Sequence, residues 1–371
     1  MGKPKVRGSR AARKTGGGRK KRPAEESYSI EDLLGKASDL LDECQFDAAE
    51  KFCQRALELD QDNVTALEMS ANLLLERGEL ERAKHCLGRA ITVQPDSGHT
   101  KYLTAGQLFS GATSRELYTK AVELLSRPGA ENEDSETRPQ LSTAYVALSE
   151  LYMSDLCDEP EAQTEAERFI ALATQVDPSN PESWQAEANY RLVIQQFEEA
   201  KESLRKSLEL WLPQHSAFLE TGEGSQTSLT FNSRVATVQL CLDLEMFDEA
   251  TLIAEGLIEE DEEVVTPWYL LGWLNYLRED PDYWGNVRHY LSRAKQVQAK
   301  NPTDDQEMIS HIEEILAEVG QEEVVEDPSD ITADIGLHDE DQERLENVVN
   351  ILDKDCEPDG GETDSQDKME S

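Results

Sequence analysis

The residues best suited to bind a partner form an aromatic stripe that directly follows a run of acids. Residues 259–263 are all Glu or Asp, and Tyr269, Trp273 and Tyr276 follow at spacings i, i+4 and i+7. On a helix these three aromatic residues would share one face. Aromatic rings beside carboxylates bind Lys- and Arg-rich peptides through cation–π contacts and burial. The pattern predicts a site for a cationic peptide; the alternative is that neighbouring helices cover the stripe.

An internal repeat of 34 residues would position this stripe. Small and apolar residues recur at that interval as the pairs Leu33/Leu67, Ala37/Ala71, Ala49/Ala83, Cys53/Leu87 and Ala56/Ala90. A 34-residue period with two helical segments per unit is the signature of tetratricopeptide repeats. Their antiparallel helix pairs stack into a solenoid with a concave groove. We therefore predict an all-α fold of about seven helix pairs.

The repeat also sets the domain boundaries. Residues 28–303 should form the solenoid, and residues 304–320 a capping helix whose apolar side chains share one face. Residues 1–27 and 321–371 lack apolar periodicity and should be disordered tails. Two intervals exceed the repeat length, and we expect the excess, Arg127–Arg138 and Pro213–Ser228, to form loops.

In the 34-residue register, the face that carries the aromatic stripe points into the concave groove. The equivalent positions in other repeats are Glu31, Glu68, Asn72, Glu76, Glu182, Gln185, Asn189, Gln239 and Asp243. All of them are acidic or amide residues, and none is Lys or Arg. A groove that grips a C-terminal carboxylate needs Lys, so we do not expect a heat-shock co-chaperone. The groove instead predicts a cationic partner segment.

The net charge of −41 is spread unevenly over the 371 residues. Residues 1–22 contain ten Lys and Arg and no acid, whereas residues 321–371 carry −16. The body between the tails still carries −35. Such acidity disfavours direct nucleic-acid binding by the body and favours a basic protein partner. The apolar runs fall far short of the about 20 residues that a membrane helix needs, so no membrane contact is expected.

The basic tail contains a candidate nuclear-import signal. Arg13 and Lys14 precede the cluster Arg19, Lys20, Lys21 and Arg22, an arrangement that resembles a bipartite signal read by an import receptor. We therefore predict a protein of the nucleus and cytoplasm. The alternatives are an arm that touches RNA and a nonspecific solubilising tail.

The sequence contains no recognisable catalytic, cofactor or metal motif. The six His lack helical pairing and metal-ligand spacing with Cys, and no phosphate-binding glycine motif follows a strand. The six Cys form no C-x-x-C pair, which is typical of reduced thiols in a cytosolic or nuclear protein. We expect neither enzymatic activity nor a cofactor.

Three segments carry a resemblance to a known family. They are Lys101–Leu108 (KYLTAGQL), Glu150–Cys157 (ELYMSDLC) and Glu259–Trp273. They lie in degenerate or inserted repeats, where the general repeat pattern does not explain them. Over roughly residues 28–300 the sequence resembles the dedicated assembly chaperones of the fourth large-subunit ribosomal protein.

The resemblance implies a function as well as a fold. It implies an acidic solenoid that binds a long basic loop of a newly made ribosomal protein and accompanies it into the nucleus, without a catalytic residue. The residues alone leave two alternatives open. One is a scaffold in an RNA-processing or transcription complex, and the other is a chaperone for other basic clients such as histones.

Overall fold

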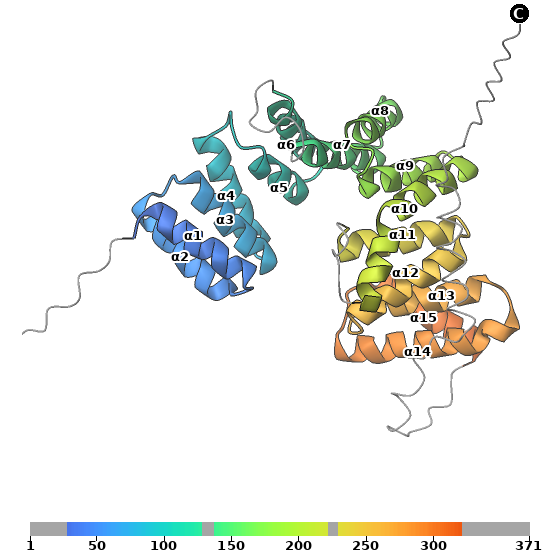
Figure 1. Ribbon diagram of the computed structural model, residues 1–371. Helices are drawn as coiled ribbons and strands as arrows, with labels where there is room; N and C mark the ends of the chain where they lie inside the picture. Colours follow the sequence, from blue (N-terminus) through green and yellow to red (C-terminus); the bar gives the residue numbers. More distant parts are fainter. Residues whose placement is uncertain (1–27, 128–136, 222–228, 321–371) are drawn as a thin grey trace, which may run out of the picture. The chain divides into compact units, whose positions relative to one another are not determined.

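The computed structural model describes residues 28–127, 137–221 and 229–320 of the chain, and these residues are helical throughout apart from turns (Figure 1). The helices are α1 (Ile30–Asp42), α2 (Phe46–Leu59), α3 (Val64–Glu76), α4 (Leu80–Val93), α5 (Thr100–Leu108), α6 (Gly111–Leu125), α7 (Thr137–Met153), α8 (Ala162–Val176), α9 (Pro181–Val193), α10 (Phe197–Thr221), α11 (Phe231–Asp243), α12 (Phe247–Glu260), α13 (Val265–Leu277), α14 (Trp284–Lys300) and α15 (Gln306–Val319). The predicted all-α fold, with seven helix pairs and one final helix, is confirmed.

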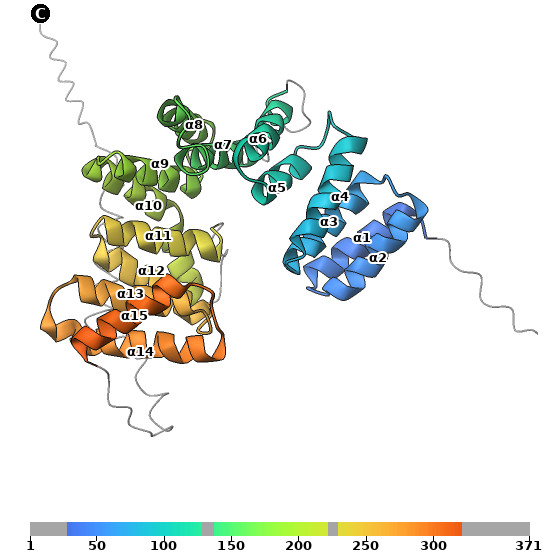
Figure 2. The ribbon, with the colours of Figure 1, turned by 180° about the vertical axis from the view of Figure 1, so that it is seen from behind.

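The chain divides into two compact units, at Asp96 and Ser97. The first unit contains α1–α4, and the second contains α5–α15. Within the second unit, the pairs α9/α10, α11/α12 and α13/α14 stack in succession, and α15 packs against α13 and α14 (Figure 2). The repeat pattern indicated a single body from residue 28 to 303 and did not indicate this division.

The first helix of several pairs begins at a capping residue that the sequence supplies. The Ser29 hydroxyl accepts a hydrogen bond from the Asp32 N–H at 3.1 Å, and the Asp32 carboxylate accepts one from the Ser29 N–H. Side chains cap α3, α9, α11 and α15 in a similar way from Asn63, Asn180, Thr230 and Asp305. These bonds satisfy N–H groups that the helix itself leaves unpaired, so the helix starts are fixed locally.

Small residues allow the two helices of a pair to approach closely. Ala37, Ala71 and Ala188 are fully buried. A Cβ atom on Gly272 of α13 would overlap the Leu291 side chain of α14. The alternation of small and large residues in the repeat is therefore a packing pattern.

In two repeats, the large residue is a Trp that ties the helix pair to the preceding turn. The Trp184 indole N–H donates to the Pro178 carbonyl at 2.9 Å, and the Trp268 N–H donates to the Glu262 carbonyl at 3.0 Å. Each acceptor lies six residues before its Trp. Trp268 is only 7% exposed, as expected for a packing residue.

Arg234 occupies the equivalent position in the intervening repeat, and it is 2% exposed. Its guanidinium pairs with Glu260 of α12 at 2.7 Å and lies 3.0 Å from His215 Nε2 of α10. The His215 ring packs against Trp211, with 5.7 Å between ring centroids. Burial and the neighbouring Arg234 charge lower the pKa of His215, so the ring is neutral and can accept from the guanidinium.

The C-terminal half of α10 corrects one expectation. Pro213 was expected to open a loop, but α10 continues through it to Thr221. Trp211 and Leu212 pack into the core shared with α11 and α12, and this burial favours continued helix. The remainder of the expected loop, residues 222–228, lies outside the described residues, as does most of the other one, residues 128–136.

Candidate functional site

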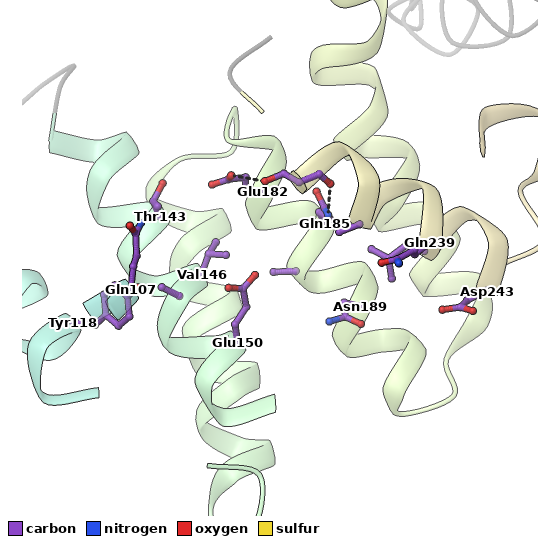
Figure 3. A pocket seen from close by; sticks show the side chains of 15 residues that line it. Gln107, Tyr118, Thr143, Val146, Glu150, Glu182, Gln185, Asn189, Gln239 and Asp243 are labelled. Atoms are coloured by element: carbon purple, nitrogen blue, oxygen red, sulfur yellow. Dashed lines mark hydrogen bonds between the residues drawn. The ribbon is translucent and has the colours of Figure 1, made fainter. Parts of the chain in front are cut away.

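A hollow of about 450 Å³ lies between α5, α6, α7, α9 and α11 of the second unit (Figure 3). Its lining residues are Gln107, Tyr118, Thr143, Val146, Ala147, Glu150, Glu182, Gln185, Ala186, Asn189, Ser233, Ala236, Gln239, Leu240 and Asp243. We call this hollow the inner groove, because the first helices of successive pairs supply most of its wall. Its polar side chains are carboxylates, amides and hydroxyls, with no Lys, Arg or His among them.

The repeat register predicted five of the residues that line the inner groove. Glu182, Gln185 and Asn189 lie on one face of α9, and Gln239 and Asp243 lie on the facing side of α11. The structure therefore brings together residues that are up to 61 positions apart in the sequence. Their role in partner binding stays a prediction.

A short chain of hydrogen bonds orients the side chains where α9 meets α11. The Gln185 amide N–H donates to the Ser233 carbonyl at 3.1 Å, and the Ser233 hydroxyl donates to Glu182 Oε1 at 3.4 Å. Thr230 fixes Ser233 in turn by accepting its backbone N–H at 3.1 Å. The Gln185 carbonyl oxygen is shielded from water and has no hydrogen-bond partner in the described part of the chain. It is an acceptor without a donor.

The carboxylates of the inner groove are in an environment that disfavours their charge. Burial raises the pKa of Glu182, although its hydrogen bond from Ser233 opposes the rise. Glu150 is exposed, but the protein around it partly desolvates its carboxylate. This desolvation, reinforced by the Glu182 charge, raises the pKa of Glu150. Desolvation also raises the pKa of Asp243. Among the described residues, none of the three forms an ion pair, so their charge is available to a partner.

Sequence reasoning missed the part of the groove that the degenerate repeats supply. Gln107 and Glu150 belong to two of the segments that carry the family resemblance. The resemblance therefore marked these segments, but the 34-residue repeat could not assign either residue to a helix face. Tyr118 reaches the groove from α6, where its ring lies against Gly106, leaving no space for a Cβ atom there. Burial, with a smaller effect of the Glu150 charge, raises the pKa of Tyr118 to about 12. The Tyr118 phenol therefore stays protonated, and its ring forms part of the wall of the groove.

The same degenerate repeats are joined by two contacts of equal sequence separation. The Gly111 N–H donates to the Asp155 carboxylate at 2.8 Å, and Arg115 donates to both Glu159 carboxylate oxygens at 2.8 Å. Each contact spans 44 residues and ties the start of α6 to the turn after α7. These polar contacts thus hold the irregular repeats in place.

The aromatic stripe corrects a second expectation, because α15 packs over it. The Tyr269 hydroxyl lies 2.8 Å from His311 Nδ1, and the Tyr276 hydroxyl donates to Glu318 at 2.7 Å. Trp273 meets the His311 ring edge-on at 5.5 Å between centroids. All three aromatic residues are partly buried, and none lines the inner groove. The final helix therefore packs against the stripe, and a role of the stripe in partner binding stays a prediction.

Other predicted site residues lie elsewhere. Glu68 is half-buried on α3, and Asn72 and Glu76 are exposed on the same helix of the first unit, so they do not line the inner groove. The candidate import signal and the acidic tail fall outside the described residues. In the part of the chain that the structure describes, no cluster of His, Cys, Asp or Glu could hold a metal ion. No described helix has the length and apolarity to cross a bilayer.

Comparison with known proteins links this architecture to one group. The tetratricopeptide-repeat family pattern matches residues 40–105. A Schizosaccharomyces pombe protein named "Probable assembly chaperone of rpl4" is 31% identical over 270 residues, which cover 68% of this chain and 79% of that protein. An Emericella nidulans protein of the same name is 27% identical and covers 93% of this chain and 97% of its own.

Solved structures agree with the sequence comparisons. The structure of "Assembly Chaperone of RpL4 (Acl4) (Residues 1-338)" has a TM-score of 0.58 at 29% identity, and the match covers 68% of this chain and 97% of that one. The Cut9-Hcn1 hetero-tetramer of the APC/C matches with a TM-score of 0.54 at 10% identity and shares the fold alone.

Proposed function

Because the chain belongs to the family of tetratricopeptide assembly chaperones of rpl4, we propose that it binds the basic loop of a newly made large-subunit ribosomal protein in its inner groove and escorts that protein to the nucleus. The relatives' names supply the class of client. The carboxylates of the inner groove support this choice of binding place. No catalytic step or cofactor is part of the proposal.

The observation that carries the proposal is a groove with carboxylates but no ion pair. Glu150, Glu182 and Asp243 have no cationic partner among the described residues, and the body around them is strongly acidic. A free Lys- and Arg-rich loop would be steered to this surface, and its charge would be screened there. Ribosomal RNA has a higher charge density and would take over the loop at assembly.

Purification of the tagged full-length chain from cells, followed by mass spectrometry, tests the client. We expect one large-subunit ribosomal protein to dominate, and its capture to fall at least about tenfold when Glu150, Glu182 and Asp243 are replaced by Gln, Gln and Asn, because each lost charge contact contributes on the order of 1 kcal/mol. The control replaces Glu198, Glu199 and Glu209, exposed acids of α10 outside the groove, by Gln. Histones or an RNA-processing complex as the dominant partner would support the competing functions instead.

The escort part of the proposal is supported by the basic tail. Residues 1–22 carry ten cationic side chains, including the paired clusters that begin at Arg13 and Arg19. Deletion of residues 1–22 should shift a fluorescent fusion from the nucleus to the cytoplasm while circular dichroism of the purified protein stays unchanged. If nuclear accumulation persists, import depends on the client or on another segment of the chain.

A further inference from the structure

We propose that the inner groove selects arginine over lysine in the segment it binds, with Glu150 and Glu182 receiving a guanidinium. This inference rests on the proposed function, because it takes the groove as the place where the cationic segment binds. Attraction by an acidic surface alone would not distinguish the two cations. The arrangement of the acceptors, and the apolar side chains beside them, do.

The acceptors of the groove are spread over several helices. Glu150 comes from α7 and Glu182 from α9, and Gln185, whose unpartnered carbonyl oxygen is shielded from water, lies one turn along α9 from Glu182 (Figure 3). The bond from Gln185 to the Ser233 carbonyl fixes the amide, so its oxygen cannot exchange places with its nitrogen without losing that bond. A guanidinium presents five N–H donors in a planar fork and can serve acceptors in several directions at once. An ammonium places three donors at a single point.

The surroundings of these acceptors penalise a strongly hydrated cation. Val146, Ala147, Ala186 and Leu240 line the same groove and make part of its wall apolar. Burial is the main cause of the raised pKa values of Glu150 and Glu182, although Glu150 is still exposed and Glu182 is half-buried. A guanidinium is weakly hydrated and stays charged when it is desolvated, whereas an ammonium loses more hydration and has a pKa that burial lowers.

Binding of two synthetic peptides to the full-length chain tests the proposal. The peptides have the same length, the same charge and the same neutral residues, and one carries Arg wherever the other carries Lys. We expect the Arg peptide to bind about tenfold more tightly by calorimetry, which corresponds to one additional charge-assisted hydrogen bond. In the Glu150→Gln/Glu182→Gln double variant, the two affinities should become nearly equal.

A matched variant and distinct outcomes separate this inference from the proposed function. Glu198→Gln/Glu209→Gln removes the same charge from the exposed face of α10 and should keep the preference for Arg. Equal affinity of the native chain for both peptides would overturn the arginine preference and leave the chaperone function standing. Preference retained in the Glu150→Gln/Glu182→Gln variant would also overturn it. If neither peptide binds, the acidic groove is not the client site, and the proposed function fails with it.

Discussion

Replacement of Trp273 by Ala is expected to lower the free energy of unfolding by about 3 kcal/mol, the lower end of the range for large aromatic truncations in a core. Trp273 stacks on Tyr269 at 5.8 Å between centroids and meets the edge of His311 at 5.5 Å. It contacts both the core of α11–α13 and the core beneath α15. Loss of the indole would therefore open a cavity at the point where the last helix joins the body. Chemical denaturation followed by circular dichroism measures the effect.

Trp284 is the matched control for this prediction. It is a Trp of the same unit, at the start of α14, and it is 39% exposed. Trp284→Ala should change the stability by less than about 1 kcal/mol, as is usual at exposed positions. If Trp273→Ala proves no more damaging than Trp284→Ala, then α15 does not cover the aromatic stripe, and the stripe returns as a candidate binding face.

Replacement of Glu260 by Gln is expected to destabilise the second unit by about 3 kcal/mol, because it leaves a buried guanidinium without its counter-charge. Arg234 is 2% exposed, and its other close partner, His215 at 3.0 Å, is neutral. Gln keeps the size of Glu260 and removes the charge. The Glu260 side chain is itself 30% exposed, which keeps the cost at the lower end of the range for broken buried pairs. Thermal unfolding at neutral pH measures the loss.

Glu259→Gln provides the control, because it removes the same charge one residue earlier in the chain. The Glu259 side chain is exposed and forms no ion pair among the described residues. Its effect should stay within about 0.5 kcal/mol. Arg234→Met in the Glu260→Gln background should restore part of the loss, because it removes the uncompensated charge and retains the volume. Equal stability of Glu260→Gln and Glu259→Gln would mean that Arg234 does not depend on this pair.

The 34-residue register was sufficient for the two repeats that supply α9 and α11 to the inner groove. It placed Glu182, Gln185 and Asn189 on the correct face of α9, and Gln239 and Asp243 on that of α11, because the same helix face is buried or open in every regular unit. Fold class, pair number and the final helix followed from the same periodicity. The register failed in α5–α7, because inserted residues there break the 34-residue spacing from which a helix face is assigned. Without that spacing, Glu150 could not be assigned to the inner groove.

The aromatic stripe shows a different limit of sequence reasoning. The spacing of Tyr269, Trp273 and Tyr276 identified a shared face correctly, and the final helix was predicted separately from its own apolar stripe. Neither pattern says that one surface covers the other. That depends on the path of residues 301–305 between α14 and α15 and on single contacts such as that of Tyr269 with His311. Periodicity identifies which residues share a helix face, whereas the packing of one helix face on another depends on individual side chains.

The uncompensated carboxylates of the inner groove have a consequence for the lifetime of the protein in a cell. Like charges held together in one groove oppose the compact state, so the chain without a bound segment is less stable than it would be with amides there. A bound cationic segment removes that repulsion and stabilises the native state by mass action. Unfolding, and with it exposure to proteases, is then most frequent in the unoccupied molecule. The abundance of such a chaperone would follow the supply of its client with no separate regulator, since occupancy itself would set its turnover.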